Sequence, residues 1–519
     1  MCGDGSGRHG GLASTSLPEV LRGWWGPHRI LSALLATTVL ALFTPLVAIA
    51  APTGTDNFTW QRDELFKELE AVFVAAREQP LEQVRAELGG LITSAEPLLA
   101  AVVRSGPNPP LDPLSQLEPL LFQGAALAAS HPQLLATLQP WVERCREVVL
   151  TAAMRWPVDD PGVHAAIYRV VYGGRTALEE ALIQNGTAAL PPLWLAPPVT
   201  SETPSMVVEG VEVHSGDLLL SRGDAPTSAL IARGVPFPGN FSHVAMLHVD
   251  PATHVGTVIE SLIETGGTLT PVETFLAGRK LRVMVLRPRP GLPAVAADPL
   301  MPHRVASAML ERVKGHHPGY DFGHWWQDDT RMFCSEVPYH AYRSGGVELW
   351  RWRQTLSSPG LVRWMRDMGV ENFTMLLPSD LEYDPQLVTV AEWRNPAGLW
   401  QDRIDNAVLD ALLEQAEAGA RLDFSPWLLP AGWATKGLTV WQKHPAIPHG
   451  LTVDAALRVR ALKSAVYPRL FAAVEEDAVA FRRDHGYQAP YWSLLEIARV
   501  AVRRLGPDLK PHLVLPPRR

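Results

Sequence analysis

The stretch SHVAMLHVDPATHVGTVIESL, residues 242–262, decides the fold of this chain. An apolar run starts at Val244, a polar turn follows at residues 250–253, and a second, β-branched run starts at Gly256. Two short apolar runs separated by Asp, Pro and Thr are typical of paired antiparallel strands. We therefore expect a β-hairpin in this part of the chain.

This hairpin would bring a histidine and a carboxylate together. If Pro251 and Ala252 form the centre of the turn, His243 lies directly opposite Glu260. Directly opposed side chains share a face of the sheet, with Cβ atoms ~5 Å apart. A carboxylate there can orient an imidazole and favour its protonated form. Taken singly, a histidine bonded to main chain and a solvated glutamate are the commoner cases.

A cysteine that could act as a nucleophile lies farther along, in the segment FCSE, residues 333–336. Pro338 is tolerated in a helix only within the first turn, so a helix must begin close to Cys334. Free N–H groups at a helix start lower the pKa of a nearby thiol. The alternatives are a buried structural cysteine or a disulfide with Cys145, which lies in a helical stretch.

The residues around these motifs predict a mixed domain. Further short apolar runs bounded by Gly, Pro and Asp predict strands at 216–220 and 281–286, and residues 302–314 predict a helix. The fold class is therefore α+β, an antiparallel sheet packed on helices, flanked by all-α regions at both ends. About five helices are expected over residues 63–185.

The chain divides by composition into five predicted segments. They are a signal peptide or membrane anchor (1–51), a helical domain (52–190), a Pro-rich linker (191–207), the sheet-containing domain (208–396) and a C-terminal helical region (397–519). In the last segment, helices are expected at 403–418, 453–483 and 493–505, and Pro468 should split the second.

The N-terminal segment has the features of an export signal. Arg22, His28 and Arg29 precede the uncharged run 30–51, and Ala48-Ile49-Ala50 offers a small-x-small cleavage site. An uncleaved anchor is the alternative, because ~20 apolar residues can span a bilayer. We expect a periplasmic or extracytoplasmic protein, either free or anchored in the inner membrane.

Bulk composition excludes several classes of function. The 519 residues carry a net charge of -8 with scattered basic residues, so no nucleic-acid partner is expected. There is no dinucleotide fingerprint, phosphate loop or GxSxG elbow, and no cofactor is predicted. The histidines near Cys334 lack the spacing of a metal site, so no metal is predicted either.

Several short motifs occur in a fixed order, His before acid before Cys, which is reversed from papain. They are Gly216-Asp217-Leu218-Leu219, Ser242-His243-Val244-Ala245-Met246, Val258-Ile259-Glu260-Ser261, Tyr320-Asp321-Phe322 and Phe333-Cys334-Ser335-Glu336. Together they resemble the permuted NlpC-type papain-like cysteine hydrolases. The resemblance is closer to the YiiX/YaeF-like branch, which is related to lecithin:retinol acyltransferase domains, and it covers roughly residues 208–395.

This resemblance implies a circularly permuted papain-like core. It implies His243 as the base, Glu260 as the residue that orients it and Cys334 as the nucleophile. Tyr320 matches a family tyrosine near the site, where contact with substrate or the oxyanion is expected. The Cys334 main-chain amide is the simplest further oxyanion donor.

Three functions remain open at this point. The first is an exported hydrolase of amide bonds, acting on cell-wall peptides or related substrates. The second is a thiol-dependent acyl-ester hydrolase or acyltransferase on lipids, and the third is a non-catalytic binding scaffold.

Two groups of tryptophans, Trp325-Trp326 and Trp350-Arg351-Trp352, flank Cys334 in the sequence. They either pack in the core or form the wall of a cleft for an apolar substrate. The partners would be a peptide or acyl-bearing substrate and a membrane met through the N-terminal segment; protein partners are unknown.

Overall fold

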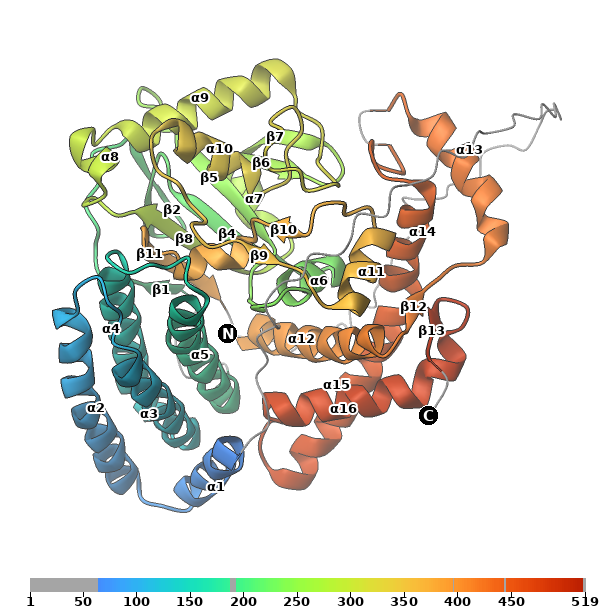
Figure 1. Cartoon of the computed structure of the whole chain (residues 1–519). Helices are drawn as coiled ribbons and strands as arrows, with labels where there is room; N and C mark the ends of the chain where they lie inside the picture. Colours follow the sequence, from blue (N-terminus) through green and yellow to red (C-terminus); the bar gives the residue numbers. More distant parts are fainter. Residues whose placement is uncertain (1–63, 187–192, 395, 443–444, 517–519) are drawn as a thin grey trace, which may run out of the picture. The chain divides into compact units, whose positions relative to one another are not determined.

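The computed structural model of this chain describes residues 64–186, 193–394, 396–442 and 445–516 (Figure 1). The predicted signal or anchor at 1–51 lies outside these ranges. A seven-stranded sheet has the order β1-β11-β8-β4-β5-β6-β7, and every neighbouring pair is antiparallel. Its strands are β1 (Leu193–Leu195), β4 (Leu218–Gly223), β5 (His243–Val249), β6 (Gly256–Leu262), β7 (Gly266–Pro271), β8 (Lys280–Pro288) and β11 (Leu387–Arg394).

Alternating side chains give the sheet two apolar faces. One face carries residues such as Val244 and Met246 and packs against α9 (Met301–His316) and α10 (Glu336–Ser344). The other face carries Ala245 and Leu247 and packs against α7 (Val272–Ala277) and the hairpin of β2 (Ser205–Val208) and β3 (Val211–His214). The fold is therefore the predicted α+β arrangement of an antiparallel sheet with helices.

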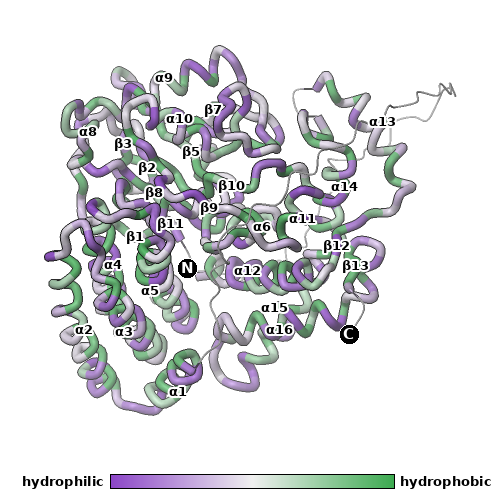
Figure 2. Tube along the Cα trace, viewed as in Figure 1, coloured by the Kyte–Doolittle hydropathy of each residue, from purple (hydrophilic) through white to green (hydrophobic). Residues whose placement is uncertain are grey.

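Within residues 64–186 five α-helices precede the sheet, as the periodicity predicts. They are α1 (Glu64–Arg77), α2 (Leu81–Arg104), α3 (Leu111–Ser130), α4 (Leu135–Ala153) and α5 (Pro161–Asn185). Apolar and polar residues alternate along them (Figure 2), and their apolar stripes meet in one core. Asp160 caps α5, because its Oδ1 accepts hydrogen bonds from the amides of Gly162 and Val163.

Among the described residues, α2 alone is long and apolar enough to cross a membrane by length and composition. Within the hydrophobic window of this helix, 22% of the residues are buried. Val84, Leu88 and Leu99 on this helix are buried in the bundle. A helix at the edge of a soluble bundle passes the same test, so α2 carries no argument for a membrane span.

The C-terminal helices are α12 (Pro396–Glu417), α13 (Leu429–Thr439), α14 (Val453–Ala461), α15 (Tyr467–His485) and α16 (Tyr491–Leu505). The predicted break at Pro468 is confirmed, since a π-helical turn at Leu462–Val466 separates α14 from α15. The N–H groups of the first turn of a helix have no acceptor within the helix, so Pro468, which lacks an N–H, is tolerated at the start of α15. The pair of β12 (Arg421–Leu422) and β13 (Leu513–Val514) completes this end. A further two-stranded pair, β9 (Gln354–Thr355) with β10 (Thr374–Met375), lies earlier in the chain, before β11.

The remaining short helices are α6 (Pro226–Arg233), α8 (Pro293–Ala297) and α11 (Pro359–Asp367). The structure differs from the sequence prediction in the linker and in two strands. The expected linker 191–207 contains β1, which pairs with β11 and so belongs to the main sheet. β7 and β11 were not predicted. β7 contains Gly and Pro, which are typical of loops. β11 carries charged residues, which suggest an exposed segment but form ion pairs inside the protein.

A buried ionic cluster joins the bundle, the sheet and α12. Arg282 on β8 binds Glu179 of α5 (2.5 Å) and Asp402 of α12 (2.7 Å), and Arg175 of α5 binds Glu392 of β11. Their side chains are at most 7% exposed. Charges this deep are tolerated only when they are paired. The three regions are therefore held together by one network of opposite charges.

Candidate active site

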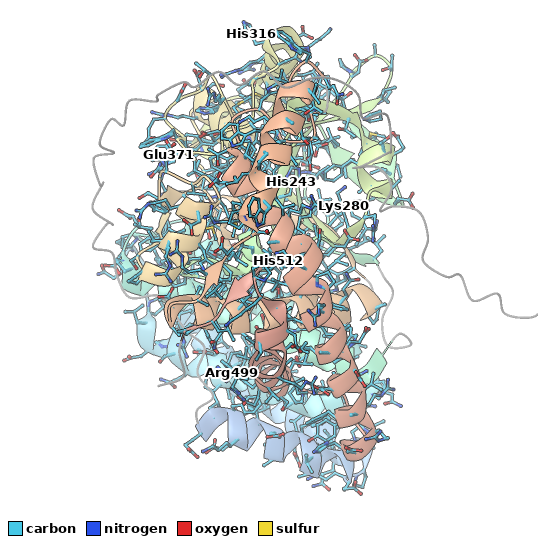
Figure 3. The ribbon with its side chains drawn as sticks, turned by 90° about the vertical axis from the view of Figure 1, so that its right-hand side faces the viewer. His243, Lys280, His316, Glu371, Arg499 and His512 are labelled. Atoms are coloured by element: carbon cyan, nitrogen blue, oxygen red, sulfur yellow. The ribbon has the colours of Figure 1, made fainter. Side chains whose placement is uncertain are left out.

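His243 and Glu260 lie together at the start of β5 and the end of β6 (His243 is labelled in Figure 3). His243 Nε2 is 2.9 Å from Glu260 Oε2. The Thr270 hydroxyl on β7 donates to Glu260 Oε1 at 2.7 Å. Both carboxylate oxygens are engaged, so the carboxylate is fixed and can in turn fix the imidazole.

The predicted turn is wrong in its position, although the predicted shared face is confirmed. The structure pairs Met246 with Ile259, where a turn centred on Pro251-Ala252 would pair it with Thr257. Asp250 Oδ1 accepts from the amides of Ala252 and Thr253, which builds a longer loop that closes at residue 255. A shift of two residues keeps every side chain on its face, whereas a shift of one would reverse it.

Cys334 lies two residues before the first residue of α10, which the placement of Pro338 predicts. Glu336 Oε2 accepts the amide of Phe333 at 2.6 Å, and Ser335 O accepts the amide of Tyr339 at 3.1 Å. These bonds form the turn that presents the sulfur. Cys334 is 7% exposed and carries a free thiol, and the buried Cys145 is free as well, so the disulfide alternative is wrong.

The thiol and the imidazole interact directly. Burial disfavours the thiolate, but hydrogen bonding to His243, the charge of His243 and the amide of Val244 outweigh it and lower the pKa of Cys334. Burial also disfavours the imidazolium, but bonds to Cys334 and Glu260 outweigh it and raise the pKa of His243 to about 9. Because Nε2 faces Glu260, Nδ1 is left for the sulfur. The favoured state is a thiolate–imidazolium pair.

The carboxylate partner is charged as well. Burial opposes the charge of Glu260, but the hydrogen bond from His243 outweighs it and lowers the pKa of this carboxyl. Cys145 forms the contrast, because burial raises the pKa of its thiol to about 12. The two described cysteines therefore differ in ionisation, and only Cys334 has the surroundings of a reactive thiol.

Two neutral acids stand beside the thiol. Tyr320 is half-buried against Phe322, with ring centroids 4.8 Å apart, and burial together with the charge of Cys334 raises its pKa well above the usual range. Burial raises the pKa of Glu336 to about 9. Both groups hold their protons at neutral pH, so they add no negative charge near the thiolate and can donate hydrogen bonds.

Sequence reasoning missed several residues of this site. In the sequence, Glu336 is only the last residue of the Cys334 motif, although an acid in the first turn of a helix is a known capping signal. Thr270 gave no signal because its strand was not predicted. Lys280, labelled in Figure 3, lies over the Phe275 ring with its Nζ 4.0 Å from the centroid, and its charge also acts on Glu260.

Other sequence candidates lie elsewhere. Trp350 is buried and donates to Leu377 O, and Trp352 stacks on His164 with ring centroids 4.4 Å apart. Of the two alternatives for Trp350 and Trp352, packing inside the protein is therefore the correct one. His248 points to the opposite face from His243, since the two are an odd number of residues apart on one strand, and it stacks on His303. Among the residues that the structure describes, no group of three or more His, Cys, Asp or Glu is arranged to hold a metal ion.

An antiparallel sheet that places a histidine–glutamate pair beside a cysteine at a helix start is the arrangement that papain-like thiol hydrolases use. Residues 212–391 match the family described as permuted papain-like amidase enzyme, YaeF/YiiX, C92 family. The chain therefore carries a domain of this family, and the resemblance drawn from the motifs is confirmed.

A similar solved structure is the crystal structure of the metalloprotein YiiX from Escherichia coli O157:H7. It is 23% identical, with a TM-score of 0.27, and the match covers 34% of this chain and 95% of that chain. No curated protein matches this chain.

Proposed function

We propose that this protein is an exported cysteine hydrolase that cleaves amide bonds, with Cys334 as nucleophile, His243 as acid and base, and Glu260 as the orienting residue. Membership of an amidase family supports the reaction class. The observation that carries the assignment of residues is the 2.9 Å contact of His243 with Glu260, beside a thiol whose pKa is lowered.

In this proposal the Cys334 sulfur attacks the amide carbonyl and forms a C–S bond. His243 gives its proton to the departing nitrogen as the C–N bond breaks, which leaves a thioester. His243 then takes a proton from water, the hydroxide attacks the thioester carbon, and the C–S bond breaks to restore the thiolate. The Cys334 amide and the neutral Tyr320 hydroxyl are the proposed donors to the oxyanion.

The proposed substrate is a cell-wall peptide or a related amide outside the cytoplasm. Export rests on the sequence of residues 1–51, which the described structure does not include. A buried thiol at 7% exposure favours an extended, slender substrate segment that can reach the sulfur. A peptide stem fits this requirement.

The second candidate is an acyl-ester hydrolase or acyltransferase on lipids, and one observation favours it. Trp427, Trp433 and Trp441 on and beside α13 are 89%, 60% and 93% exposed. Tryptophan side chains exposed along one helix are typical of proteins that meet the membrane–water interface. This observation concerns location at a lipid surface, so it ranks below the family match for the reaction itself.

The test is labelling with thiol-directed electrophiles, one series on peptides and one on acyl chains, applied to wild type and Cys334→Ala. Peptide probes should label wild type and leave Cys334→Ala unlabelled. Preference for acyl probes would move the assignment to the lipid candidate. No labelling of the folded wild type by either series would favour the binding scaffold.

A further inference from the structure

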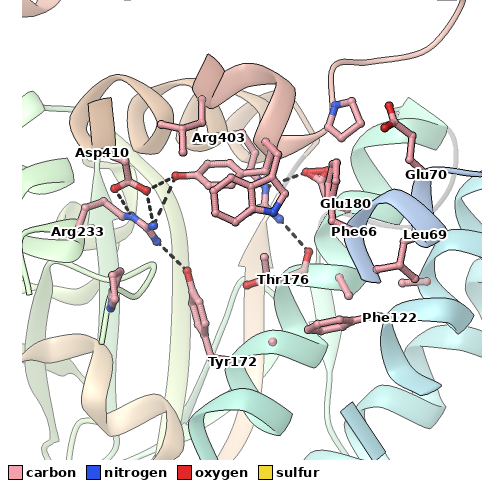
Figure 4. Close-up of a pocket in the computed structure, with 18 of the residues that line it drawn as sticks. Phe66, Leu69, Glu70, Phe122, Tyr172, Thr176, Glu180, Arg233, Arg403 and Asp410 are labelled. Carbon is pink, nitrogen blue, oxygen red and sulfur yellow. Dashed lines mark hydrogen bonds and ion pairs between the residues drawn. The ribbon is translucent and has the colours of Figure 1, made fainter. Parts of the chain in front are cut away.

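A cavity of about 690 Å³ lies between the N-terminal bundle and the C-terminal helices (Figure 4). It is lined from α1, α3 and α5 on one side and from α12 and α16 on the other. None of Cys334, His243 and Glu260 lines it. Its volume falls within the range of about 300–1,000 Å³ that is usual for small-molecule sites.

Small residues line part of this space. Ala125, Ala126 and Ala129 of α3 and Gly173 and Ala177 of α5 face the cavity. Protein interiors are ordinarily packed without large voids, because a void forfeits the contacts of every atom around it. Because α3 and α5 both line the cavity with alanine or glycine, they leave room for a ligand.

Aromatic and aliphatic residues complete the apolar wall. The aromatic rings come from α1, α3 and α16, and they are Phe66, Phe73, Phe122 and Trp492. Leu69, Leu413 and Leu495 add aliphatic surface. A wall of this composition suits a flexible hydrocarbon chain.

One end of the cavity is polar, and part of it is already satisfied internally. Arg233 Nη2 binds Asp410 Oδ2 at 2.6 Å, and Tyr491 donates to the same carboxylate (Figure 4). Carboxylates at the rim are also engaged, since Glu414 pairs with Arg499 at 2.6 Å and Glu417 accepts the amide of Leu361 at 2.8 Å. These groups are not available to a ligand.

Arg403 is only partly satisfied. Its side chain is 4% exposed; its Nη2 donates to Thr176 O at 2.8 Å and lies 3.9 Å from Glu179 Oε2, and its guanidinium lies over the Tyr491 ring. Its Nε lies 3.6 Å from Glu180 Oε1 and has no hydrogen-bond acceptor among the described residues. The Thr176 hydroxyl beside it is buried and near the Tyr172 hydroxyl, without a hydrogen bond of normal geometry. Burial raises the pKa of Glu180, which weakens its charge as a partner for Arg403.

A buried guanidinium N–H without an acceptor is costly, and an acceptor brought by a ligand would remove that cost. We propose that the cavity binds a single-chain amphiphile with an anionic head, of which a long-chain fatty acid is the simplest, with the tail along α3 and α5 and the head at Arg403 and Thr176. The proposal stands apart from the hydrolase assignment, because no residue is shared between the two sites.

The test is calorimetric titration of the full chain with palmitate. We expect Ala177→Phe, which fills the cavity from α5, to weaken binding at least about tenfold. Ala166→Phe is the matched control, because Ala166 is a half-buried residue of the same helix that does not line the cavity, and it should bind within about twofold of wild type. Thr176→Val should weaken palmitate by about tenfold through loss of one bond to a charged group.

Two further arms distinguish binding in this cavity from non-specific adsorption of hydrocarbon and from binding at Cys334. Hexadecyltrimethylammonium, with the same tail and a cationic head, should not displace palmitate, and Cys334→Ala should bind palmitate as wild type does. Equal affinity of wild type and Ala177→Phe, displacement by the cationic amphiphile, or loss of binding in Cys334→Ala would each overturn the proposal. If Ala177→Phe does not fold, as judged by thermal melting, Ala126→Phe on α3 tests the same space.

Discussion

At the scale of residues, the thiolate–imidazolium pair makes a prediction about pH. The pKa of Cys334 is lowered, so its alkylation by iodoacetamide should reach its plateau at a lower pH than that of an ordinary cysteine. At pH 7 we expect Cys334 to react at least about a hundredfold faster than Cys145, whose thiol has a pKa of about 12. Peptide mapping of the labelled protein measures both rates.

Amide hydrolysis should follow a different profile. His243 has a pKa of about 9, and it must be protonated to give a proton to the departing nitrogen. Hydrolysis should therefore decline as pH rises through about 9, while alkylation of the thiolate should not. An alkylation rate that climbs tenfold per pH unit up to pH 9, as for an ordinary cysteine, would contradict the pair.

The three proposed catalytic residues should behave as one unit. Cys334→Ala and His243→Ala should each abolish turnover, and the double variant should be no worse than either. Glu260→Gln keeps a hydrogen-bonding group but loses the charge, so we expect a loss of about 10- to 100-fold. Cys145→Ala is the matched control and should keep turnover. A folded Cys334→Ala with the wild-type rate would move the function to the binding scaffold.

At the scale of elements, β7 supports the site through one hydroxyl. Thr270→Val leaves a buried oxygen of Glu260 without a donor, which should cost about 1–3 kcal/mol of stability and lower kcat. Thr268→Val is the control. Thr268 lies on β7, as Thr270 does, and pairs with Glu260 of β6, but its hydroxyl donates to Gly266 O. Urea titration and steady-state kinetics measure both effects; equal behaviour of the two variants would exclude the role of Thr270.

The hairpin explains how far sequence could go at this scale. Side chains alternate between the two faces of a strand with a period of two. The prediction that His243 and Glu260 share a face was therefore correct although the predicted register was wrong by two residues. The register depended on the Asp250 side chain, which builds a longer loop than the dipeptide Pro-Ala suggested. The helix at Cys334 was predictable because proline restricts where a helix can begin.

Long-range features were beyond such reasoning. Thr270 gave no functional signal, and Glu336 gave none beyond its place in the Cys334 motif, because the importance of both comes from contacts that appear only in the folded chain. The cavity is likewise invisible in the sequence, since its lining comes from helices that are far apart along the chain. Local sequence patterns predicted where helices and strands lie and which side chains share a face of the sheet. Which residues pack against each face depends on the tertiary structure, which local patterns do not show.

At the scale of the whole molecule, the buried ionic cluster makes the flanking helices part of one structure with the sheet. Glu179 of α5 lies 2.5 Å from Arg282 Nη1 of β8 and 3.0 Å from Arg175 Nε. Burial opposes its charge, yet Arg282, Arg175 and Arg403 lower its pKa to about 2. This carboxylate therefore balances several arginines from different parts of the chain.

Removing that carboxylate should destabilise the bundle and the sheet together. Glu179→Ala leaves buried arginines without their partner, so we expect a loss of about 3–5 kcal/mol in the free energy of unfolding. Glu64→Ala is the control, because its pair with Lys67 is exposed and should be worth less than about 1 kcal/mol. Differential scanning calorimetry should give one transition that shifts as a whole in Glu179→Ala. If the transition instead splits, with one part unmoved, the helical flanks unfold independently and the cluster does not couple them to the sheet.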